Sequence, residues 1–225
     1  MGRTIKEMMA VIGLVAIAVL VSKSVVSAEP AEATARQIRF AIAPQSTLML
    51  YGNSTLHKFS FEAQKIAGEL TVATDSMRKN PLEAVVNDRQ GQVSIPVVQL
   101  KSGEKGLDKN MRKAMEAKKY PEITFTLKDI QNVEESDSAG NWKTMQAQGL
   151  LEISGTENQI TLDIRGTQVS DTKLRFTGQT NLRMTDYGIE PPTMRLGAIK
   201  TENKMKITFN IIIESNQSLA LSLGE

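Results

Sequence analysis

The sequence predicts an all-β protein, an antiparallel barrel or sandwich of about eight strands. Apolar and polar residues alternate through most of the chain, which is the pattern of strands with one buried face. Turn residues such as Gly, Ser, Asn and Asp separate these segments, and helical spacing is confined to one short stretch. A closed barrel of about eight strands has an interior that side chains fill or that holds one ligand.

We predict that residues 1–28 form a cleaved secretory signal. Arg3 and Lys6 precede an unbroken apolar run at Met8–Val21, and residues 26–28 include the small side chains that signal peptidase accepts. The run is shorter than the about 20 residues of a membrane span, so an uncleaved N-terminal anchor is the less favoured alternative.

Three further segments differ in composition. Residues 29–37 are rich in Ala and Glu and are predicted to be a disordered lead-in. Residues 38–214 contain the alternating segments and form one predicted barrel domain, whereas residues 215–225 are a weakly patterned C-terminal tail. We therefore predict a single folded domain that uses most of the chain.

The composition excludes several classes of function. The chain contains no cysteine, which excludes disulfides, thiolate metal sites and cysteine nucleophiles. Residues 29–225 carry 24 basic and 24 acidic side chains, so the predicted mature protein is neutral. Proteins that bind nucleic acid normally have a large basic excess, and we therefore predict no nucleic-acid partner.

The predicted strands follow one another after the lead-in. Polar stretches at 136–141 and 154–158 predict hairpins, and Gly178 is predicted to bend its strand. The apolar positions of the predicted strands are Leu48, Leu50, Phe59, Phe61, Ala63, Ile66, Leu70, Val72, Val93, Ile95, Val97, Ile123, Phe125, Leu127, Leu151, Ile153, Ile160, Leu162, Ile164, Leu174, Phe176, Leu182, Met184, Ile207, Phe209, Ile211 and Ile213.

One segment predicts a short helix instead of a strand. Residues 107–118 contain no β-branched residue, and Pro121 is expected to end the helix. The apolar stripe at helical spacing consists of Leu107, Met111, Ala114 and Met115.

Four stretches of the chain carry motifs in a specific order. They are Ser46-x-Leu48-x-Leu50-x-Gly52-x-Ser54-Thr55-Leu56-His57-x-Phe59; Leu107-Asp108 through Met111 and Met115 to Tyr120-Pro121-x-Ile123-x-Phe125; Gly149-x-Leu151-x-Ile153-x-Gly155-Thr156 with Ile160-x-Leu162; and Met184-Thr185-Asp186-Tyr187-Gly188-Ile189-x-Pro191-Pro192 with Gly197 and Ile207-x-Phe209. Together they cover about residues 38–213 and resemble the YceI-like family of secreted lipid-binding proteins. The region 40–46 departs from many members, because it lacks their Trp and their Ile-Asp-x-x-His-Ser stretch.

The resemblance implies an eight-stranded antiparallel lipocalin-like β-barrel with one short helix across a mouth. It implies a ligand such as a long polyisoprenoid, a quinone tail or a related amphiphile, held in an elongated apolar tunnel. It also implies a periplasmic setting and a role in lipid carriage, lipid storage or envelope stress. The departure at 40–46 leaves the identity of the ligand open, and the sequence leaves the oligomeric state open, a homodimer included.

A tunnel for such a ligand needs apolar walls and no polar partner, and Met and Phe adapt well to a flexible chain. Alternation does not distinguish a hollow barrel from one whose inward side chains form a filled core. A stress or structural adaptor with a filled barrel and no ligand is therefore the alternative function. The candidate ligand-binding residues are Phe59, Phe61, Phe125, Phe176, Leu182 and Phe209 from the strands, with Met111 and Met115 from the helix.

The predicted helix lies in a segment of positive charge. Residues 101–119 carry seven basic and three acidic side chains. These charges predict either contact with an anionic membrane surface or phosphate headgroup, or a solvated face with pairs such as Asp108–Arg112, which we favour. The basic residues of the helix and its end are Lys109, Arg112, Lys113, Lys118 and Lys119.

The sequence gives little support for an enzyme. His57 is the only histidine, so a metal site would need carboxylates for nearly every other ligand. No Gly-x-Ser-x-Gly elbow is present. We therefore predict no catalytic residues, metal or cofactor, and expect His57 to lie at a strand end with local hydrogen bonds. A weak enzyme that acts on a bound lipid, with His57 as its base, is the third hypothesis.

Overall fold

The computed structural model describes residues 37–73, 81–87, 89–135, 142–194 and 198–216. The predicted signal at 1–28, the lead-in up to residue 36, the predicted hairpin at 136–141 and the tail from residue 217 onward lie outside the described residues.

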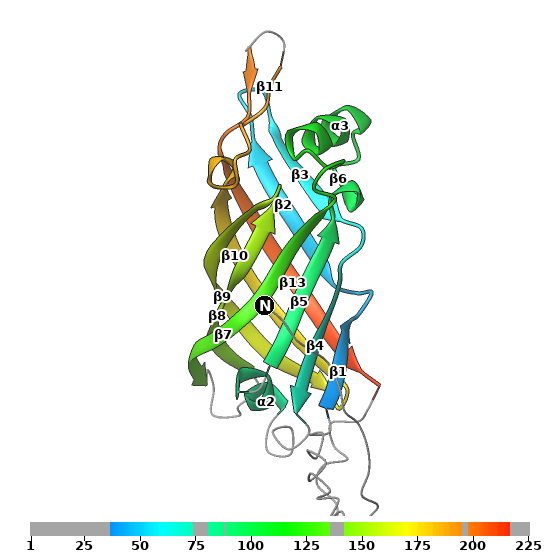
Figure 1. Ribbon diagram of the computed structural model, residues 1–225, viewed down its shortest axis with the longest axis vertical. Helices are drawn as coiled ribbons and strands as arrows, with labels where there is room; N and C mark the ends of the chain where they lie inside the picture. The colour runs from blue at the N-terminus through cyan, green and yellow to red at the C-terminus, as the bar shows by residue number, and fades with distance from the viewer. Residues whose placement is uncertain (1–36, 74–80, 88, 136–141, 195–197, 217–225) are drawn as a thin grey trace, which may run out of the picture. The chain divides into compact units, whose positions relative to one another are not determined.

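The strands close into an eight-stranded antiparallel barrel, which confirms the predicted fold class (Figure 1). Because the sheet returns on itself, its wall leaves few unpaired strand edges. The order around the barrel is β1 (Gln37–Ile42), β4 (Ala67–Ala73), β5 (Arg89–Pro96), β7 (Glu122–Glu135), β8 (Trp142–Ile153), β9 (Thr156–Ser170), β10 (Lys173–Arg183) and β13 (Lys204–Ser215), which pairs with β1.

The sheet branches at β13, which pairs with two different strands along its length. Residues 213–215 of this strand pair with β1, whereas residues 206–210 pair with β2 (Thr47–Asn53). β2 continues the sheet through β3 (Lys58–Ala63) to the short strand β6 (Leu100–Lys101). The 3-10 helix η1 (Val97–Gln99) connects β5 to β6, so the β2–β3–β6 extension is joined to the barrel through the chain as well as through β13.

Two helices lie at opposite ends of the barrel (Figure 1). Helix α3 (Lys105–Ala114) is the predicted helix, and helix α2 (Pro81–Asn87) was not predicted. We refer to the two ends as the α3 end and the α2 end. In the described part of the chain, no helix has the length and apolarity needed to cross a membrane.

Helix α3 ends earlier than the sequence predicted. The expectation that it runs to Lys118 and stops at Pro121 is wrong, because the last helical residue is Ala114. Glu116 has a φ of 48° and therefore lies in the left-handed region, which interrupts the helical path. The Tyr120 ring then packs on Gly155 in the β8–β9 turn, where a Cβ atom would collide with the ring.

The predicted hairpin at 154–158 is confirmed, with a tighter loop than expected. Ile153 pairs with Thr156, so only Ser154 and Gly155 form the connection between β8 and β9. Their φ angles are 52° and 75°. Positive φ at both central residues is the requirement of a type I′ hairpin turn, which Gly satisfies without strain.

Two separate clusters of buried side chains lie along the barrel. The α2-end cluster contains Ile38, Phe40, Leu70, Val72, Leu82, Ala84, Val85, Ile130, Met145, Ala147, Leu174 and Ile213. The α3-end cluster contains Phe61, Ala63, Ile95, Val97, Leu100, Met115, Ile123, Leu151, Tyr187 and Ile189. Tyr187 belongs to the 3-10 helix η2 (Met184–Tyr187), which follows β10 at this end.

Candidate functional site

An apolar cavity of about 230 Å³ lies inside the barrel. All eight barrel strands, together with β2 and α2, contribute to its wall. Among the described residues that line it, only Glu69, Gln92 and Thr180 have polar side chains. The others are Ile42, Leu48, Leu50, Leu70, Val85, Gly91, Val93, Ile95, Ile123, Phe125, Leu127, Ile130, Ala147, Leu151, Ile153, Ile160, Leu162, Ile164, Phe176, Leu182, Ile207, Phe209, Ile211 and Ile213.

The exposure of the inward side chains shows that the barrel is hollow. On β9, Ile160, Leu162 and Ile164 line the cavity, yet each keeps part of its surface accessible. Their polar neighbours Thr161 and Asp163 are exposed on the outer face. Inward side chains of a filled barrel would be fully covered at this depth, because protein interiors are close-packed. Space in the lumen therefore accounts for the surface that these residues retain.

Two phenylalanine rings pack against the wall over glycine residues. A Cβ atom on Gly178 would lie 2.5 Å from Cζ of Phe209, its direct cross-strand partner. A Cβ atom on Gly149 would lie 2.5 Å from the Phe125 ring. Each ring thus occupies the space that a side chain on the neighbouring strand would take. This arrangement moves ring volume out of the lumen, and it explains Gly178 as a site of close approach, whereas the sequence predicted a bend there.

The α2 end is closed by a helix that faces the cavity directly. Leu82, Ala84 and Val85 of α2 are at most 3% exposed, and Val85 is part of the cavity wall. Phe40 of β1 and Leu174 of β10 are fully buried in the same cluster. Together these side chains form an apolar floor at the α2 end.

The α3 end is closed by a layer that separates the helix from the cavity. Met115 and Tyr187 are buried in the α3-end cluster, and Leu107 and Met111 of α3 pack against it. None of these four side chains is among the described residues that line the cavity. Burial raises the pKa of the Tyr187 hydroxyl, although a hydrogen bond with Asn158 acts in the opposite direction.

A buried carboxylate fixes the start of α3. Asp108 is 7% exposed and accepts hydrogen bonds from the backbone N–H of Ser102 at 2.8 Å and from Ser102 Oγ at 2.7 Å. Burial raises the pKa of the Asp108 carboxyl, but these hydrogen bonds, together with the charges of Lys101 and Arg112, outweigh burial and leave its pKa below the ordinary value. Asp108 is therefore ionised, and its charge is used within the helix start.

The structure divides the candidate ligand-binding residues into two groups. Phe125, Phe176, Leu182 and Phe209 line the cavity together. Phe61 and Met115 are buried in the α3-end cluster, and Phe59 and Met111 pack against it. The Phe59 and Phe61 rings meet edge to face, with their centroids 5.9 Å apart. Contact of either group with a ligand stays a prediction.

Most of the cavity wall is aliphatic and lies outside the set of predicted ligand-binding residues. Leu48, Leu50, Ile160, Ile207 and Ile211 line the cavity. They occupy the same alternating positions as the chosen phenylalanines, so the periodicity already marked them as inward-facing. No corresponding signal in the sequence points to Val85, because it reaches the cavity from the unpredicted helix α2.

His57 lies at the β2–β3 turn, outside the residues that line the cavity, in agreement with its expected place at a strand end. Its backbone N–H donates to Ser54 Oγ at 3.2 Å, and its carbonyl accepts from Ser54 Oγ at 2.9 Å. The side chain is exposed. Among the residues that the structure describes, no three His, Asp or Glu side chains gather in a way that could hold a metal ion.

The barrel is similar to several solved structures. A polyisoprenoid binding domain from Saccharophagus degradans, implicated in plant cell wall breakdown, matches with a TM-score of 0.58 and 14% identity over 80% of this chain and 99% of that chain. BcnA of Burkholderia cenocepacia matches with a TM-score of 0.56 and 16% identity over 74% of this chain and 95% of that one. The YCEI protein of Campylobacter jejuni matches with a TM-score of 0.52 and 15% identity over 74% and 85% of the two chains. At these identities the similarity establishes the fold alone.

The sequence itself identifies the family. No curated protein matches the chain. A family model described as the YceI-like domain matches residues 30–213, which include every barrel strand except the last two residues of β13. The chain therefore belongs to the YceI-like domain family.

Proposed function

We propose that this protein binds a long apolar lipid, a polyisoprenoid or a quinone-like chain, in the barrel cavity and serves in its carriage or storage. The observation that supports the proposal most directly is the hollow apolar lumen of about 230 Å³. An engineered apolar cavity of about 150 Å³ stays dry and binds benzene, so a larger space with apolar walls favours an apolar ligand over water.

The energy of burial is sufficient for such a ligand. Burying about ten methylenes at about 0.8 kcal/mol each contributes about 8 kcal/mol, before the costs of association are subtracted. The few polar side chains around the lumen leave no basis for recognition by many hydrogen bonds. The name of the Saccharophagus degradans domain, a polyisoprenoid binding domain of similar fold, supports the same class of ligand.

The proposal places the protein in the periplasm, where a lipid carrier would exchange ligand with membranes and act during envelope stress. The signal-like composition of residues 1–28 supports this location. Fractionation of the producing cell tests it, because a periplasmic protein is released when the outer membrane is permeabilised and lacks the first 28 residues. Recovery of the full-length chain in the cytoplasmic fraction would contradict this part of the proposal.

The proposal includes no covalent chemistry. His57, the base of the alternative enzyme hypothesis, is exposed at the β2–β3 turn and is absent from the residues that line the cavity. We expect His57→Ala to leave both the amount and the chemical identity of the bound lipid unchanged. A modified lipid that appears with the native protein and disappears with His57→Ala would favour the enzyme hypothesis.

The decisive experiment is native mass spectrometry of the protein purified from an exporting host, followed by organic extraction and identification of the lipid. We expect a co-purified mass near one per protein that extracts as a prenyl chain or a quinone. Apo protein that stays unliganded after incubation with polyprenyl lipids would instead favour the adaptor without a ligand.

A matched pair of variants tests whether the co-purified lipid occupies the cavity. Leu162 faces the lumen opposite Ala147, whereas its neighbour Thr161 is exposed on the outer face. We expect Leu162→Trp to fill the lumen and lower the lipid content, and Thr161→Trp to leave it unchanged. Equal lipid content in the two variants, with both folded by circular dichroism, would place the ligand outside the cavity.

A further inference from the structure

We infer that the α3 end of the barrel docks on the surface of an anionic phospholipid membrane through three lysines of α3: Lys105, Lys109 and Lys113. The docking surface is distinct from the cavity. Docking does not depend on whether the cavity holds the proposed lipid.

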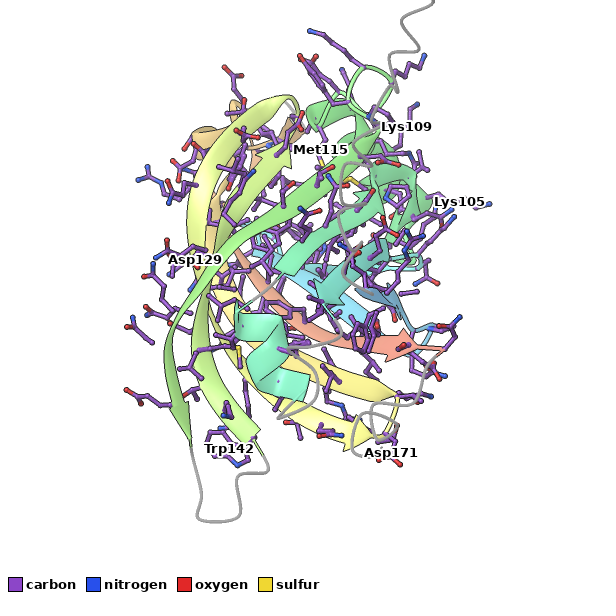
Figure 2. All side chains as sticks on the ribbon, turned by 60° about the horizontal axis from the view of Figure 1, so that its bottom comes forward. Lys105, Lys109, Met115, Asp129, Trp142 and Asp171 are labelled. Carbon is purple, nitrogen blue, oxygen red and sulfur yellow. The ribbon has the colours of Figure 1, made fainter. Side chains whose placement is uncertain are left out.

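The three lysines share one face of the helix. They are spaced by four residues, which places them in a row along α3, and each is exposed. The apolar side chains Leu107 and Met111 lie on the opposite side and pack against the α3-end cluster. Figure 2 shows Lys105 and Lys109 on the outer side of the molecule. Packing of the apolar side thus fixes the direction in which the lysines point.

The positive charge of this face is not neutralised by neighbouring carboxylates. The sequence favoured a face balanced by pairs such as Asp108–Arg112, but Asp108 is buried and accepts two hydrogen bonds from Ser102. Its closest approach to Arg112 is 4.0 Å, a long ion pair. In the described part of the chain, no carboxylate forms an ion pair with any of the three lysines. The predicted Asp108–Arg112 pair is therefore present, but among the described residues it leaves Lys105, Lys109 and Lys113 without a paired carboxylate.

The charge is also distributed unevenly over the protein. Residues 101–119 have an excess of four basic side chains, whereas residues 29–225 as a whole are balanced. The remainder of that region thus has an acidic excess of the same size. A local basic excess on an otherwise acidic protein favours an approach to an anionic surface with the basic segment first.

An exposed apolar side chain lies at the same end. Leu56 is 66% exposed in the turn between β2 and β3, and Figure 1 shows this turn and α3 at one end of the barrel. The turn is held against β12 (Ile199–Lys200) by a hydrogen bond from the Thr55 N–H to the Lys200 carbonyl at 3.0 Å. A lipid surface presents both negative headgroups and an apolar layer beneath them, and it therefore matches lysines and a leucine together.

Co-sedimentation with vesicles tests the inference directly. We expect the full protein to bind vesicles that contain phosphatidylglycerol and not to bind vesicles of phosphatidylcholine alone. We expect the bound protein to leave the anionic vesicles as the salt concentration rises. Each lysine near an anionic surface contributes about fivefold in binding, so Lys105→Gln/Lys109→Gln/Lys113→Gln is expected to lower binding on the order of 100-fold.

The matched control removes the same number of positive charges from the barrel wall, away from α3. Arg39, Lys128 and Arg175 are exposed on β1, β7 and β10, outside the α3 segment. We expect Arg39→Gln/Lys128→Gln/Arg175→Gln to bind the anionic vesicles nearly as well as the native chain. Equal losses of vesicle binding in the two triple variants would show that only the net charge of the protein matters, and this result would overturn the inference. Vesicle binding that does not change with salt would overturn it as well.

Leu56→Ser tests the apolar contact separately, and we expect it to weaken vesicle binding severalfold while the salt dependence remains. Unchanged vesicle binding in Leu56→Ser would show that Leu56 is not part of the docking surface.

Extraction of lipid from the α3 triple variant distinguishes membrane docking from the proposed binding of lipid in the cavity. Retained lipid with lost vesicle binding supports docking as a distinct property, whereas lost lipid with retained vesicle binding would contradict it. If the native chain binds an acidic protein but no anionic vesicle, the surface serves another partner and the inference is wrong.

Discussion

The two ends of the barrel are closed in different ways. At the α2 end, a helix faces the lumen, and its side chains Leu82, Ala84 and Val85 are at most 3% exposed. At the α3 end, a layer that includes Met115 and Tyr187 lies between the helix and the cavity. Helix α2 therefore forms part of the cavity wall, whereas helix α3 lies outside the wall and covers it.

The chemistry of the two closures also differs. In the α3 closure, the helix residues Leu107, Met111 and Ala114 are only partly buried, and the helix begins at a buried carboxylate that Ser102 holds. The α2-end cluster also contains a methionine, Met145, but the α2 residues within it, Leu82, Ala84 and Val85, are at most 3% exposed. We therefore expect the α3 end to open locally at a lower free energy than the α2 end. A lipid that passes through an end of the barrel would then use the α3 end.

The largest effect is expected from a charge placed in the α2 closure. Val85 is 1% exposed, so Val85→Asp buries a carboxylate without a partner and is expected to cost about 4 kcal/mol of the free energy of unfolding. Met111→Asp at the partly buried face of α3 is expected to cost about half as much. Urea unfolding of both variants measures the difference. Equal destabilisation would mean that the two ends are equally firm.

A smaller effect is expected from the wall between the ends. Gly178→Ala brings a Cβ atom within 2.5 Å of Phe209 Cζ and 2.8 Å of the Asp163 carbonyl oxygen, so the ring must turn toward the lumen and the β9 backbone must shift. Overpacking of this kind typically costs about 2 kcal/mol. We expect the variant to remain folded but to hold less lipid by extraction and mass spectrometry.

The double variant Gly178→Ala/Phe209→Leu supplies the control. Leucine removes the ring that collides with the new methyl group, and we expect part of the lost stability and lipid content to return. A double variant as poor as Gly178→Ala alone would show that the glycine serves the backbone and not the position of the ring. The thermal midpoint and the extracted lipid are measured in parallel.

The sequence predicts the wall of the barrel better than its ends. Alternation such as Ile160, Leu162 and Ile164 depends only on the pleat of each strand, and the structure confirms it along β9. Helix α2 was missed because its seven residues include the β-branched Val85 and Val86, whose local preference is for strands. Packing against the barrel stabilises its helical form, and this tertiary contact cannot be recognised from the local sequence.

The candidate site was predicted in part for a related reason. Alternation identifies the inward face, and Phe125 and Phe209 line the cavity as a result. It does not say how far along the barrel a residue lies, so Phe61, which belongs to the α3-end cluster, was chosen with the same argument. The one signal for a hollow lumen was glycine at inward strand positions such as Gly149, where it leaves room for an aromatic ring against the wall.

Acid is expected to weaken the α3 end selectively. The pKa of Asp108 is lower in the folded protein than its ordinary value of 3.8, so the unfolded chain binds the proton more tightly. The stabilisation is therefore complete above that value and is lost as the pH falls through the lower, folded pKa. At neutral pH, Asp108→Asn is expected to cost about 1.5 kcal/mol, because the bonds from Ser102 lose their charged acceptor.

Unfolding of the native chain and of Asp108→Asn between neutral pH and about pH 2.5 checks this sign. The difference between the two is expected to shrink as the pH falls, and hydrogen exchange is expected to rise in α3 before it rises in α2. A difference that stays constant with pH would show that Asp108 contributes through its shape and not through its charge.

The smallest effect is expected where the β8–β9 turn holds the end of α3. Ser154 Oγ donates a hydrogen bond to the Met115 carbonyl at 3.1 Å, and Ser154 is otherwise a turn residue with positive φ. Ser154→Ala keeps the backbone requirement and removes this bond, so we expect a loss of about 1 kcal/mol confined to the α3 end. Hydrogen exchange that quickens around Met115 and not around Val85 is the expected result. Faster exchange at both ends would mean that the barrel opens as one unit and that its two closures do not act separately.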